Sequence, residues 1–444
     1  MKILKFGGTS VGKPERMHEV ARLIRGEGMR IVVLSALSGT TNALVEIAEC
    51  LYKKDKEGAK AKIVALQKHY DTFIQSLYSS DAAREKARNM LNEHFKYLTA
   101  FTEDSFTLFE ERAVLAQGEL MSTAMFHLYM EEKGEESVLL PALDFMRIDE
   151  NEEPDMAYIT EHLAKQLKAH AGKKMFITQG YICRNAFGEI DNLKRGGSDY
   201  TASLVGAAAD AEEIQIWTDI DGMHNNDPRI VEDTFPVAAM SFEEAAELAY
   251  FGAKILHPLS VRPAKDKNIP VKLLNTMEPS ARGTTISNET GGATIKAVAA
   301  KDGITAIKIK SGRMLLAYGF LRKVFEIFER YKTPIDMITT SEVAVSLTID
   351  NVKHLDEIIK ELETFAFVEV DGDMTIVCVV GDLIVEKEGV VSKIFSSISD
   401  IPLRMISYGG SKNNISVLVP TDQKNRALNA LNVIFEEYRV PQAQ

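Results

Sequence analysis

The first fourteen residues constrain the fold more than any other part of this 444-residue chain. The strand-like range 2–6 runs directly into Gly7 and Gly8, and a helix-like segment opens at Pro14. A strand that ends in a glycine-rich turn below a helix N-terminus presents backbone N–H groups and the positive end of a helix dipole, which suit phosphate oxygens. The sequence therefore predicts an anion site at this turn, with Lys5 as its cation.

The same turn carries the spacing of a nucleotide-binding P-loop, but the motif is incomplete. Gly7, Gly12 and Lys13 stand at the expected positions, and Pro14 stands where the motif needs Ser or Thr. Proline offers neither a hydroxyl to hold Mg²⁺ nor a backbone N–H. The sequence therefore argues against a P-loop and favours Lys5, which precedes the glycines.

Composition indicates a globular chain of two or three domains, with 45% hydrophobic and 26% charged residues. No run of 18 apolar residues and no basic leader is present, so we expect neither a membrane span nor a secretion signal. A formal net charge of −12 disfavours nucleic acid and anionic membranes as partners. The widely spaced Cys50, Cys183 and Cys378 indicate reduced thiols in a cytoplasmic protein without a zinc site.

The chain begins with an α/β pattern. The apolar runs 31–34, 175–177 and 214–217 end in small polar residues and alternate with helix-patterned segments, which is typical of a mainly parallel sheet covered on both faces. Between about Lys53 and Thr102 the pattern is purely helical, charged and alanine-rich. We expect this range to be a helical excursion from the sheet domain that forms a solvated lobe.

The tail contains an internal repeat. Strand-like segments that begin at Thr305 and Met374 are each followed by a glycine-led amphipathic helix, at Gly319 and Gly389, and by a second strand that contains Met-Ile. This order predicts two small βαββαβ units after about residue 292.

A second glycine pair, Gly196 and Gly197, opens an alanine-rich helix for which Ser198 and Asp199 are good N-caps. A guanidinium beside that helix start, from Arg195, would suit a carboxylate in bidentate fashion.

A polar loop follows the predicted strand at 214–217. Its Asp219 and Asp221 suggest a calcium loop, but His224 stands where such a loop needs glycine, so we reject that reading. A polar loop after a strand is where an open α/β sheet places ligand contacts. Further along, Lys254 lies in the segment 251–258 and is a candidate phosphate ligand.

Taken in order, these motifs resemble those of the aspartokinases. The matching segments are 5–10 (KFGGTS), 34–42 (LSALSGTTN), 117–122 (QGELMS), 195–199 (RGGSD), 218–222 (TDIDG) and 252–258 (GAKILHP). The tail resembles the paired ACT domains of that family. The resemblance implies an amino acid kinase fold, a three-layer αβα sandwich with a mainly parallel sheet, followed by two α+β ferredoxin-like ACT domains. We expect the catalytic domain at 1–292, the first ACT domain at 303–372, and the second at 293–302 together with 373–440.

The resemblance implies phosphorylation of L-aspartate by ATP with Mg²⁺ to give 4-phospho-L-aspartate and ADP, the entry to lysine, threonine, methionine and diaminopimelate synthesis. The tail ends without a dinucleotide-binding domain, which is similar to the monofunctional enzymes. A carboxylate with a usual pKa near ~3.9 is already nucleophilic at neutral pH. The protein must therefore align aspartate and stabilise the transferring phosphoryl group, and no Ser-His-Asp set is needed.

The family resemblance also implies the site residues. The catalytic pair is Lys5 and Asp199, of which Asp199 organises the lysines and the Mg²⁺ shell. The aspartate ligands are Ser35, Thr41, Glu119, Arg195, Gly196 and Ser198. The ATP contacts are Lys5, Gly7, Gly8, Ser10, Thr218, Asp219, His224, Arg229 and Lys254. His224 departs from the tyrosine usual in the family, and Glu119 alone would also fit a buried structural carboxylate.

The first ACT unit resembles the effector site of lysine-sensitive aspartokinases. The implied ligands are Met314, Asp336, Thr340, Ser341 and Glu342, and two carboxylates suit an effector with a second ammonium, L-lysine. Ala317 replaces the family's serine and removes one hydrogen bond. Exposed sheet edges predict a homodimer through the ACT domains, with further pairing into a tetramer left open.

Two other classes remain open at this point. A sibling kinase of the same fold, for acetylglutamate, glutamate or uridylate, would lack the ACT tail. A non-catalytic amino-acid sensor would have lost Lys5 or Asp199, and both are present. Whether lysine acts alone or with threonine stays undecided.

Overall fold

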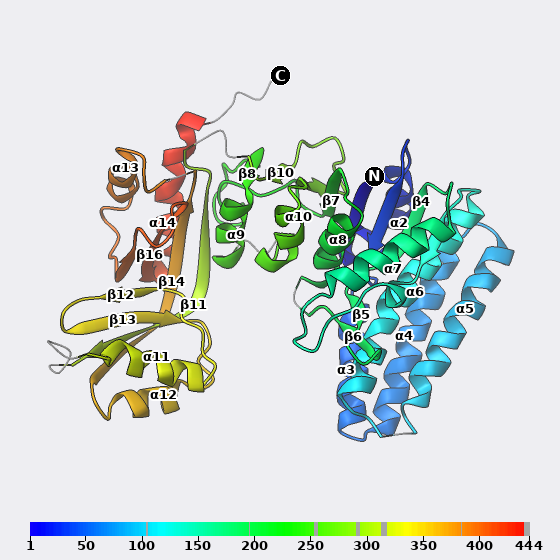
Figure 1. The fold of residues 1–444 in the computed structure, drawn as a ribbon, viewed down its shortest axis with the longest axis horizontal. Coiled ribbons are helices and arrows are strands. Elements are labelled where there is room, and N and C mark those ends of the chain that lie inside the picture. The colour runs from blue at the N-terminus through cyan, green and yellow to red at the C-terminus, as the bar shows by residue number, and fades with distance from the viewer. Residues whose placement is uncertain are drawn as a thin grey trace. The chain divides into compact units, whose positions relative to one another are not determined.

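The computed structural model describes residues 1–103, 105–194, 196–252, 256–289, 294–311, 318–382 and 384–438. The chain divides into two compact units (Figure 1). The first comprises Met1–Gly222 and Leu256–Asn288, and the second comprises Met223–Ile255 and Glu289–Gln444. Among the described residues, no helix combines the length and the apolar character needed to cross a membrane.

The first unit is built on a mainly parallel sheet with the strand order β3-β4-β2-β1-β7-β9-β10. Its strands are β1 (Lys2–Phe6), β2 (Arg30–Leu34), β3 (Val138–Leu140), β4 (Met175–Gln179), β7 (Glu213–Thr218), β9 (Val271–Asn275) and β10 (Thr284–Ser287). Strand β1 lies in the middle and pairs in parallel with β2 and β7. A hairpin of β5 (Ile182–Arg184) and β6 (Ile190–Asn192) stands apart from this sheet. The α/β class predicted from the sequence is confirmed.

Helices connect these strands. They are α1 (Gly8–Val11), α2 (Pro14–Leu23), α3 (Thr40–Tyr52), α4 (Lys56–Leu77), α5 (Asp81–Ala100), α6 (Leu108–Glu132), α7 (Met156–Ala169), α8 (Gly197–Ala208) and α10 (Arg262–Asp266). Side chains alternate between the two faces of a strand, so Ile3 and Lys5 of β1 point to one face and Leu4 and Phe6 to the other. The first face lies against α8, where a Cβ at Gly206 would be in van der Waals contact with Ile3, 3.6 Å from its Cγ1. Lys5 is thereby directed toward α8.

The helical excursion is not a solvated lobe. Helices α4 and α5 pack with α3 and α6, and their buried Tyr70, Phe73 and Phe95 share one hydrophobic core with Phe6 and Leu34 of the sheet. The Tyr70 hydroxyl shares a 3.0 Å hydrogen bond with Thr40 inside this core. The expectation of a solvated lobe is therefore wrong, because charged residues cover only the outer faces of these two amphipathic helices.

The second unit is built on a sheet with the order β12-β13-β11-β14-β16-β15. Its elements are β8 (Ala239–Ser241), α9 (Phe242–Tyr250), β11 (Ala297–Lys310), α11 (Phe320–Arg330), β12 (Ile338–Thr340), β13 (Ala344–Ile349), α12 (Leu355–Leu362), β14 (Phe367–Val380), α13 (Val390–Ser397), β15 (Met405–Ser407), β16 (Asn414–Pro420) and α14 (Lys424–Asn432). The long strands β11 and β14 pair antiparallel along their lengths, with an irregular register near Ile304.

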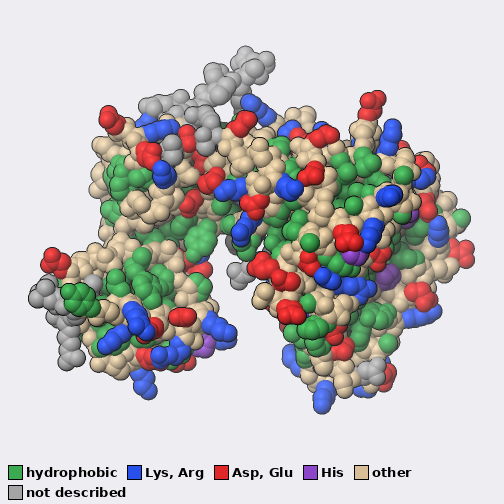
Figure 2. All heavy atoms as spheres, in the orientation of Figure 1, with side chains coloured by type: hydrophobic (Ala, Val, Ile, Leu, Met, Phe, Trp, Pro, Cys, Tyr) green, Lys and Arg blue, Asp and Glu red, His purple; other side chains and the backbone are tan. Residues whose placement is uncertain are grey.

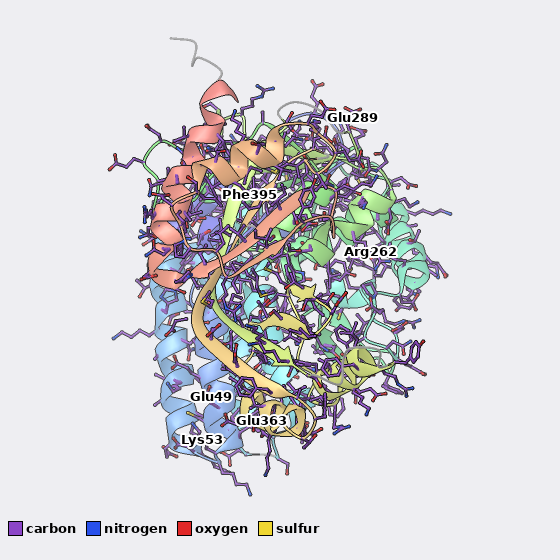
Figure 3. All side chains as sticks on the ribbon, turned by 90° about the vertical axis from the view of Figure 1, so that its left-hand side faces the viewer. Glu49, Lys53, Arg262, Glu289, Glu363 and Phe395 are labelled. Atoms are coloured by element: carbon purple, nitrogen blue, oxygen red, sulfur yellow. The ribbon has the colours of Figure 1, made fainter. Side chains whose placement is uncertain are left out.

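Each end of this pair carries one copy of the repeat. One end holds β12 and β13 with α11 and α12 around one hydrophobic core, and the other holds β15 and β16 with α13 and α14 around a second. Figure 3 labels Phe395 in α13 and Glu363 just after α12, which mark the two ends. Gly319 and Gly389 precede α11 and α13 with φ of 84° and 78°, a conformation that favours glycine. The internal repeat predicted from the sequence is confirmed.

Candidate active site

Four loops of the first unit begin at the same edge of its sheet. Phe6, the last residue of β1, is in register with Leu34 and Trp217, and Leu34 is in register with Gln179. The carboxyl ends of parallel strands are where an open α/β sheet binds ligands. The residues that follow these strands, including Gly7, Ser35, Gly180 and Asp219, therefore lie along one edge.

The glycine turn is tightly packed. The Gly7 N–H donates to the Trp217 carbonyl at 3.4 Å, and a Cβ at Gly7 would lie 3.3 Å from Lys5 Nζ. A Cβ at Gly8 would lie 3.1 Å from the Ala36 carbonyl oxygen. The Ser10 hydroxyl is buried and shares a 2.8 Å hydrogen bond with Thr276, so it holds the turn to the strand β9 end. The Lys5 ammonium therefore lies beside this glycine turn.

Lys5 and Asp199 form an ion pair of 2.8 Å between Nζ and Oδ1, and their side chains are only 12% and 15% exposed. Asp199 lies in the first turn of α8, and Lys5 lies on the strand face that α8 covers. Asp199 Oδ1 is buried. Apart from its ion pair with Lys5, it accepts no hydrogen bond from the described residues. The carboxylate therefore keeps acceptor capacity that its protein neighbours do not use.

Helix α8 starts earlier than the sequence suggested. Its N-cap is Gly196, with φ of 72°, and Ser198 and Asp199 lie inside the first turn, so the prediction that they are N-caps is wrong. Gly196 can adopt the positive φ of this cap, and Gly197 leaves room for Tyr181, since a Cβ at Gly197 would lie 2.3 Å from Cδ2 of that ring. The glycine pair lets the helix begin against this ring. As a result, Ser198 and Asp199 point toward the strand ends instead of capping the helix.

Glu119 is a buried acid near the same edge. Its side chain in α6 is 5% exposed, and the Ala36 N–H donates to its Oε1 at 3.3 Å. Burial raises the pKa of Glu119 to about 8, against the smaller opposing effect of its hydrogen bond from Ala36. An ionised carboxylate here is stabilised by a cationic partner, which an amino-acid ammonium would provide.

A chain of hydroxyls links α6, the end of β2 and α8. The Ser122 hydroxyl donates to the Ser35 carbonyl at 2.9 Å, and the Ser35 hydroxyl donates to Ser198 Oγ at 2.9 Å. A Cβ at Gly180 would lie 2.5 Å from Ser198 Oγ. Ser35, Glu119, Ser198 and the Lys5–Asp199 pair therefore occur at one edge of the first unit.

Other predicted residues lie at the margins of this cluster or elsewhere. Thr41 is exposed at the start of α3, whereas its neighbour Thr40 is buried against Tyr70. The Thr218 hydroxyl donates to Asp219 Oδ1 at 3.2 Å just after β7, and Asp219 is exposed.

Two of the predicted ATP contacts, His224 and Arg229, lie in the second unit. His224 Nδ1 and the Thr234 hydroxyl are 3.0 Å apart. Arg229 binds Asp227 through two hydrogen bonds of 2.9 and 2.7 Å, which hold the pKa of Asp227 below its usual range. Arg195, Lys254, Met314 and Ala317 lie outside the described residues.

The described residues of the predicted effector site lie in the second unit, in and around strand β12. Thr340, Ser341 and Glu342 are exposed around the end of β12. Asp336 differs, because its side chain is 1% exposed and its Oδ1 accepts hydrogen bonds from Lys301 and Tyr250, each of 2.8 Å. Asp336 is therefore bound by groups of its own chain in this structure.

Sequence reasoning did not single out Tyr181 or Ser122. Tyr181 has φ of 68°, which is strained for a non-glycine residue, and its N–H donates to Thr201 Oγ1 at 2.9 Å. Burial raises the pKa of Tyr181 to about 12, and the charge of Glu119 adds to that shift. The sequence signal for Tyr181 was limited to its place two residues after the end of β4, a strand that pairs with β2.

Comparisons of the sequence with known families and proteins give matches over most of the chain. A sequence model described as "Amino acid kinase family" matches residues 1–275, and one described as "ACT domain" matches residues 377–435. "Lysine-sensitive aspartokinase 3" of Escherichia coli is 34% identical over 97% of this chain and 98% of its own. "Aspartokinase 2, chloroplastic" of Arabidopsis thaliana is 34% identical over 98% of this chain and 84% of its own.

Solved structures show the same likeness. E. coli aspartokinase III, crystallised with aspartate and ADP in an R-state, superposes with a TM-score of 0.83 at 32% identity, covering 98% of this chain and 99% of that one. The lysine and aspartate complex of that enzyme, a T-state, gives 0.81 at 32% identity, covering 98% and 99%. The predicted amino acid kinase fold with an ACT tail is thus confirmed, and the chain belongs to the aspartokinase family.

Proposed function

We propose that this aspartokinase transfers the γ-phosphoryl group of ATP to the side-chain carboxylate of L-aspartate through the edge formed by β1, β2 and α8. The observation that carries the proposal is the partly buried Lys5–Asp199 pair beside the Gly7-Gly8 turn. A fixed ammonium at a phosphate-binding turn stabilises charge on the transferring group more strongly than an exposed one would. Asp199 holds the ammonium in place until substrate arrives.

The aspartate half of the site is assigned to Glu119, Ser35, Ser198, Gly196, Thr41 and Arg195. Ionised Glu119 pairs with the α-ammonium, and the Arg195 guanidinium clamps the α-carboxylate. The hydroxyls of Ser35 and Ser198, joined at 2.9 Å, border the same space. Binding both α-groups leaves the side-chain carboxylate as the free nucleophile, which needs only alignment with the phosphate.

The ATP half is assigned to Lys5, Gly7, Gly8, Ser10, Thr218, Asp219, His224, Arg229 and Lys254. Mg²⁺ would arrive with ATP, and the unused acceptor capacity of the buried Asp199 Oδ1 fits a role in orienting its shell. A bound Mg²⁺ supplies charge neutralisation between the phosphate oxygens. The protein's own contribution is the fixed Lys5 ammonium and the backbone donors of the glycine turn.

The proposal extends to regulation by L-lysine at Met314, Asp336, Thr340, Ser341 and Glu342. It includes the domain boundaries 1–292, 303–372, and 293–302 with 373–440, a homodimer through the ACT units with possible further pairing to a tetramer, and a cytoplasmic location. The likeness to a lysine-sensitive aspartokinase supports the effector, and the free thiols of Cys50, Cys183 and Cys378 support the location.

An acceptor panel tests the reaction. ADP release should depend on L-aspartate, while N-acetylglutamate, glutamate and uridylate support less than about a hundredth of that rate. N-acetylglutamate lacks a free α-ammonium and uridylate lacks both α-groups, so each leaves buried polar groups unpaired, and the extra methylene of glutamate moves its side-chain carboxylate out of line with the phosphate. Faster ADP release with any of the other acceptors would assign the chain to a sibling kinase instead.

Arg195→Ala tests the division of the site into two halves. Its KM for aspartate should rise sharply, because losing a charged bidentate contact costs about 2–5 kcal/mol, while the KM for ATP changes little. Steady-state kinetics with each substrate varied in turn give both constants. A rise in the ATP constant alone would mean that the two halves are exchanged.

Glu342→Lys tests the effector site. Initial rates of the natural chain should fall with millimolar L-lysine, and the variant should keep its rate but lose the inhibition, because a lysine side chain repels the effector's ammonium. If lysine acts only together with threonine, the effector assignment is incomplete. If neither amino acid changes the rate, the regulatory proposal fails.

A further inference from the structure

A network of hydrogen bonds and ion pairs, with a buried carboxylate at its centre, joins the proposed effector segment to the end of helix α9. Asp336, which precedes β12, has a side chain that is 1% exposed, and its Oδ1 accepts hydrogen bonds from Lys301 of β11 and Tyr250 of α9. Lys301 Nζ also lies 4.6 Å from the centre of the Tyr250 ring. Lys301 and Tyr250 come from two elements of the second unit, and Asp336, just before β12, accepts a hydrogen bond from each.

The network leaves one acceptor unused. Asp336 Oδ2 is buried without a hydrogen-bond partner among the described residues. Burying a carboxylate oxygen without a donor is unfavourable, so this atom has a vacant capacity for an ammonium or a hydroxyl. The proposed effector carries a second ammonium, and the other effector residues described follow closely in the chain, with Thr340 at the end of β12 and Ser341 and Glu342 directly after it.

Lys301 has a second carboxylate within reach. Its Nζ lies 2.9 Å from Asp350 Oδ2, and the Asp350 side chain is 40% exposed. An incoming ammonium at Asp336 would repel the Lys301 ammonium, since two like charges would share one carboxylate. If the incoming ammonium displaces Lys301 from Asp336, the Lys301 ammonium can keep its ion pair with Asp350.

Tyr250 connects this exchange to the catalytic sequence. It is the last residue of α9, and the chain continues through Gly252 toward the predicted ATP contact Lys254. A Cβ at Gly252 would lie only 2.1 Å from the Ala300 carbonyl oxygen. Gly252, two residues after α9, is therefore in close contact with Ala300, the neighbour of Lys301 in the chain. Burial and the hydrogen bond to Asp336 both raise the pKa of the Tyr250 hydroxyl, which therefore stays a proton donor near neutral pH.

We propose that Lys301 is an internal competitor of the effector ammonium for Asp336, and that Tyr250 transmits the occupancy of Asp336 to the end of α9. Effector binding replaces Lys301 at Asp336, moves its pairing to Asp350, and breaks the tie between Asp336 and Tyr250. This inference rests on the proposed lysine regulation and adds the residues that couple it to the catalytic part of the chain. An effector shifts an equilibrium only through contacts that differ between two states, and this exchange supplies such contacts.

Tyr250→Phe tests the transmitting step, because it removes one hydroxyl and keeps the ring. Calorimetry on the full chain should give an L-lysine affinity equal to the natural value or up to about tenfold tighter, because the effector no longer has to break the hydrogen bond between Tyr250 and Asp336. Inhibition at saturating L-lysine should fall below half of that of the natural chain. The matched control is Tyr331→Phe, which removes a 2.7 Å hydrogen bond to Glu361 in the same unit and should leave inhibition unchanged.

Lys301→Gln tests the competition. Loss of the internal ammonium should tighten L-lysine binding by about tenfold, within the usual range of coupling effects, whereas Lys301→Arg keeps the charge and should change affinity little. The inference is overturned if Tyr250→Phe is inhibited as fully as the natural chain, or if Lys301→Gln binds lysine more weakly. Absence of any lysine binding by the natural chain would instead refute the proposed regulation itself.

Discussion

At the scale of single residues, the account depends on how the sheet orients Lys5. Strand alternation directs this side chain to the face covered by α8, where Asp199 holds it at 2.8 Å. Lys13, the lysine of the incomplete P-loop motif, is exposed instead. Two lysines eight positions apart thus have opposite environments, and only one of them is held by a buried carboxylate.

We expect Lys5→Ala to lower turnover by about a hundredfold or more with little change in aspartate binding, because the lost ammonium acts on charge that develops in the transition state. Lys13→Ala is the control and should keep a near-normal rate. Rapid-quench or steady-state ADP assays measure both. Equal turnover in the two variants would contradict the assignment of Lys5.

The raised pKa of Glu119, about 8, predicts a pH dependence of substrate binding. The neutral form dominates below this value and cannot pair with an ammonium, so the KM for aspartate should fall by up to about tenfold per pH unit as the pH rises from 6.5 toward 8, and level off above. Glu119→Gln should show a higher KM without this slope. A slope that persists in the variant would place the titrating group elsewhere.

Single residues were predictable where a motif restricts the backbone. The glycines at 7, 8, 196 and 197 were recognised as pairs in the sequence, and in the structure a Cβ at each would lie between 2.3 and 3.3 Å from a neighbouring atom. Tyr181 was missed because its importance comes from φ and from contact with Gly197, neither of which has a sequence signal of its own. The burial of Asp336 was also invisible, since its partners Lys301 and Tyr250 are distant in sequence.

At the scale of elements, the grouping of helix α9 with the tail could not be predicted from the sequence. It was read as part of the catalytic segment, and the family model for the kinase fold also extends to residue 275. In the structure α9 groups with the tail, held by a buried ion pair of 2.7 Å between Glu244 and Lys296 near its start and by Tyr250 at its end. Long-range ion pairs of this kind leave no periodic pattern in a sequence.

The two long helices α4 and α5 give a stability prediction. Phe95 is 3% exposed in the core shared with the sheet, so Phe95→Ala should cost about 3–5 kcal/mol of unfolding free energy. Tyr97→Ala, at a position 43% exposed on the same helix, should cost less than about 1 kcal/mol. Urea denaturation of the full chain compares them. Similar small costs for both would restore the solvated-lobe interpretation.

At the scale of the whole molecule, the acidic composition argues against nucleic acids and anionic membranes as partners. Acidic and basic side chains are interspersed on the face shown in Figure 2, over a chain with a formal net charge of −12. Such a surface does not favour polyanions in general, and anion binding then depends on local cations such as Lys5. The repeat was also predictable, because both copies keep the same order of strand, glycine, helix and strand.

Hydroxylamine trapping during turnover tests the central claim most directly, because an acyl phosphate reacts to give a hydroxamate and a phosphate ester does not. With L-aspartate, ATP and Mg²⁺, the account predicts one aspartyl hydroxamate for each ADP released, and Lys5→Ala should lower both together. ADP released without hydroxamate, or hydroxamate formation that does not depend on Lys5, would contradict it.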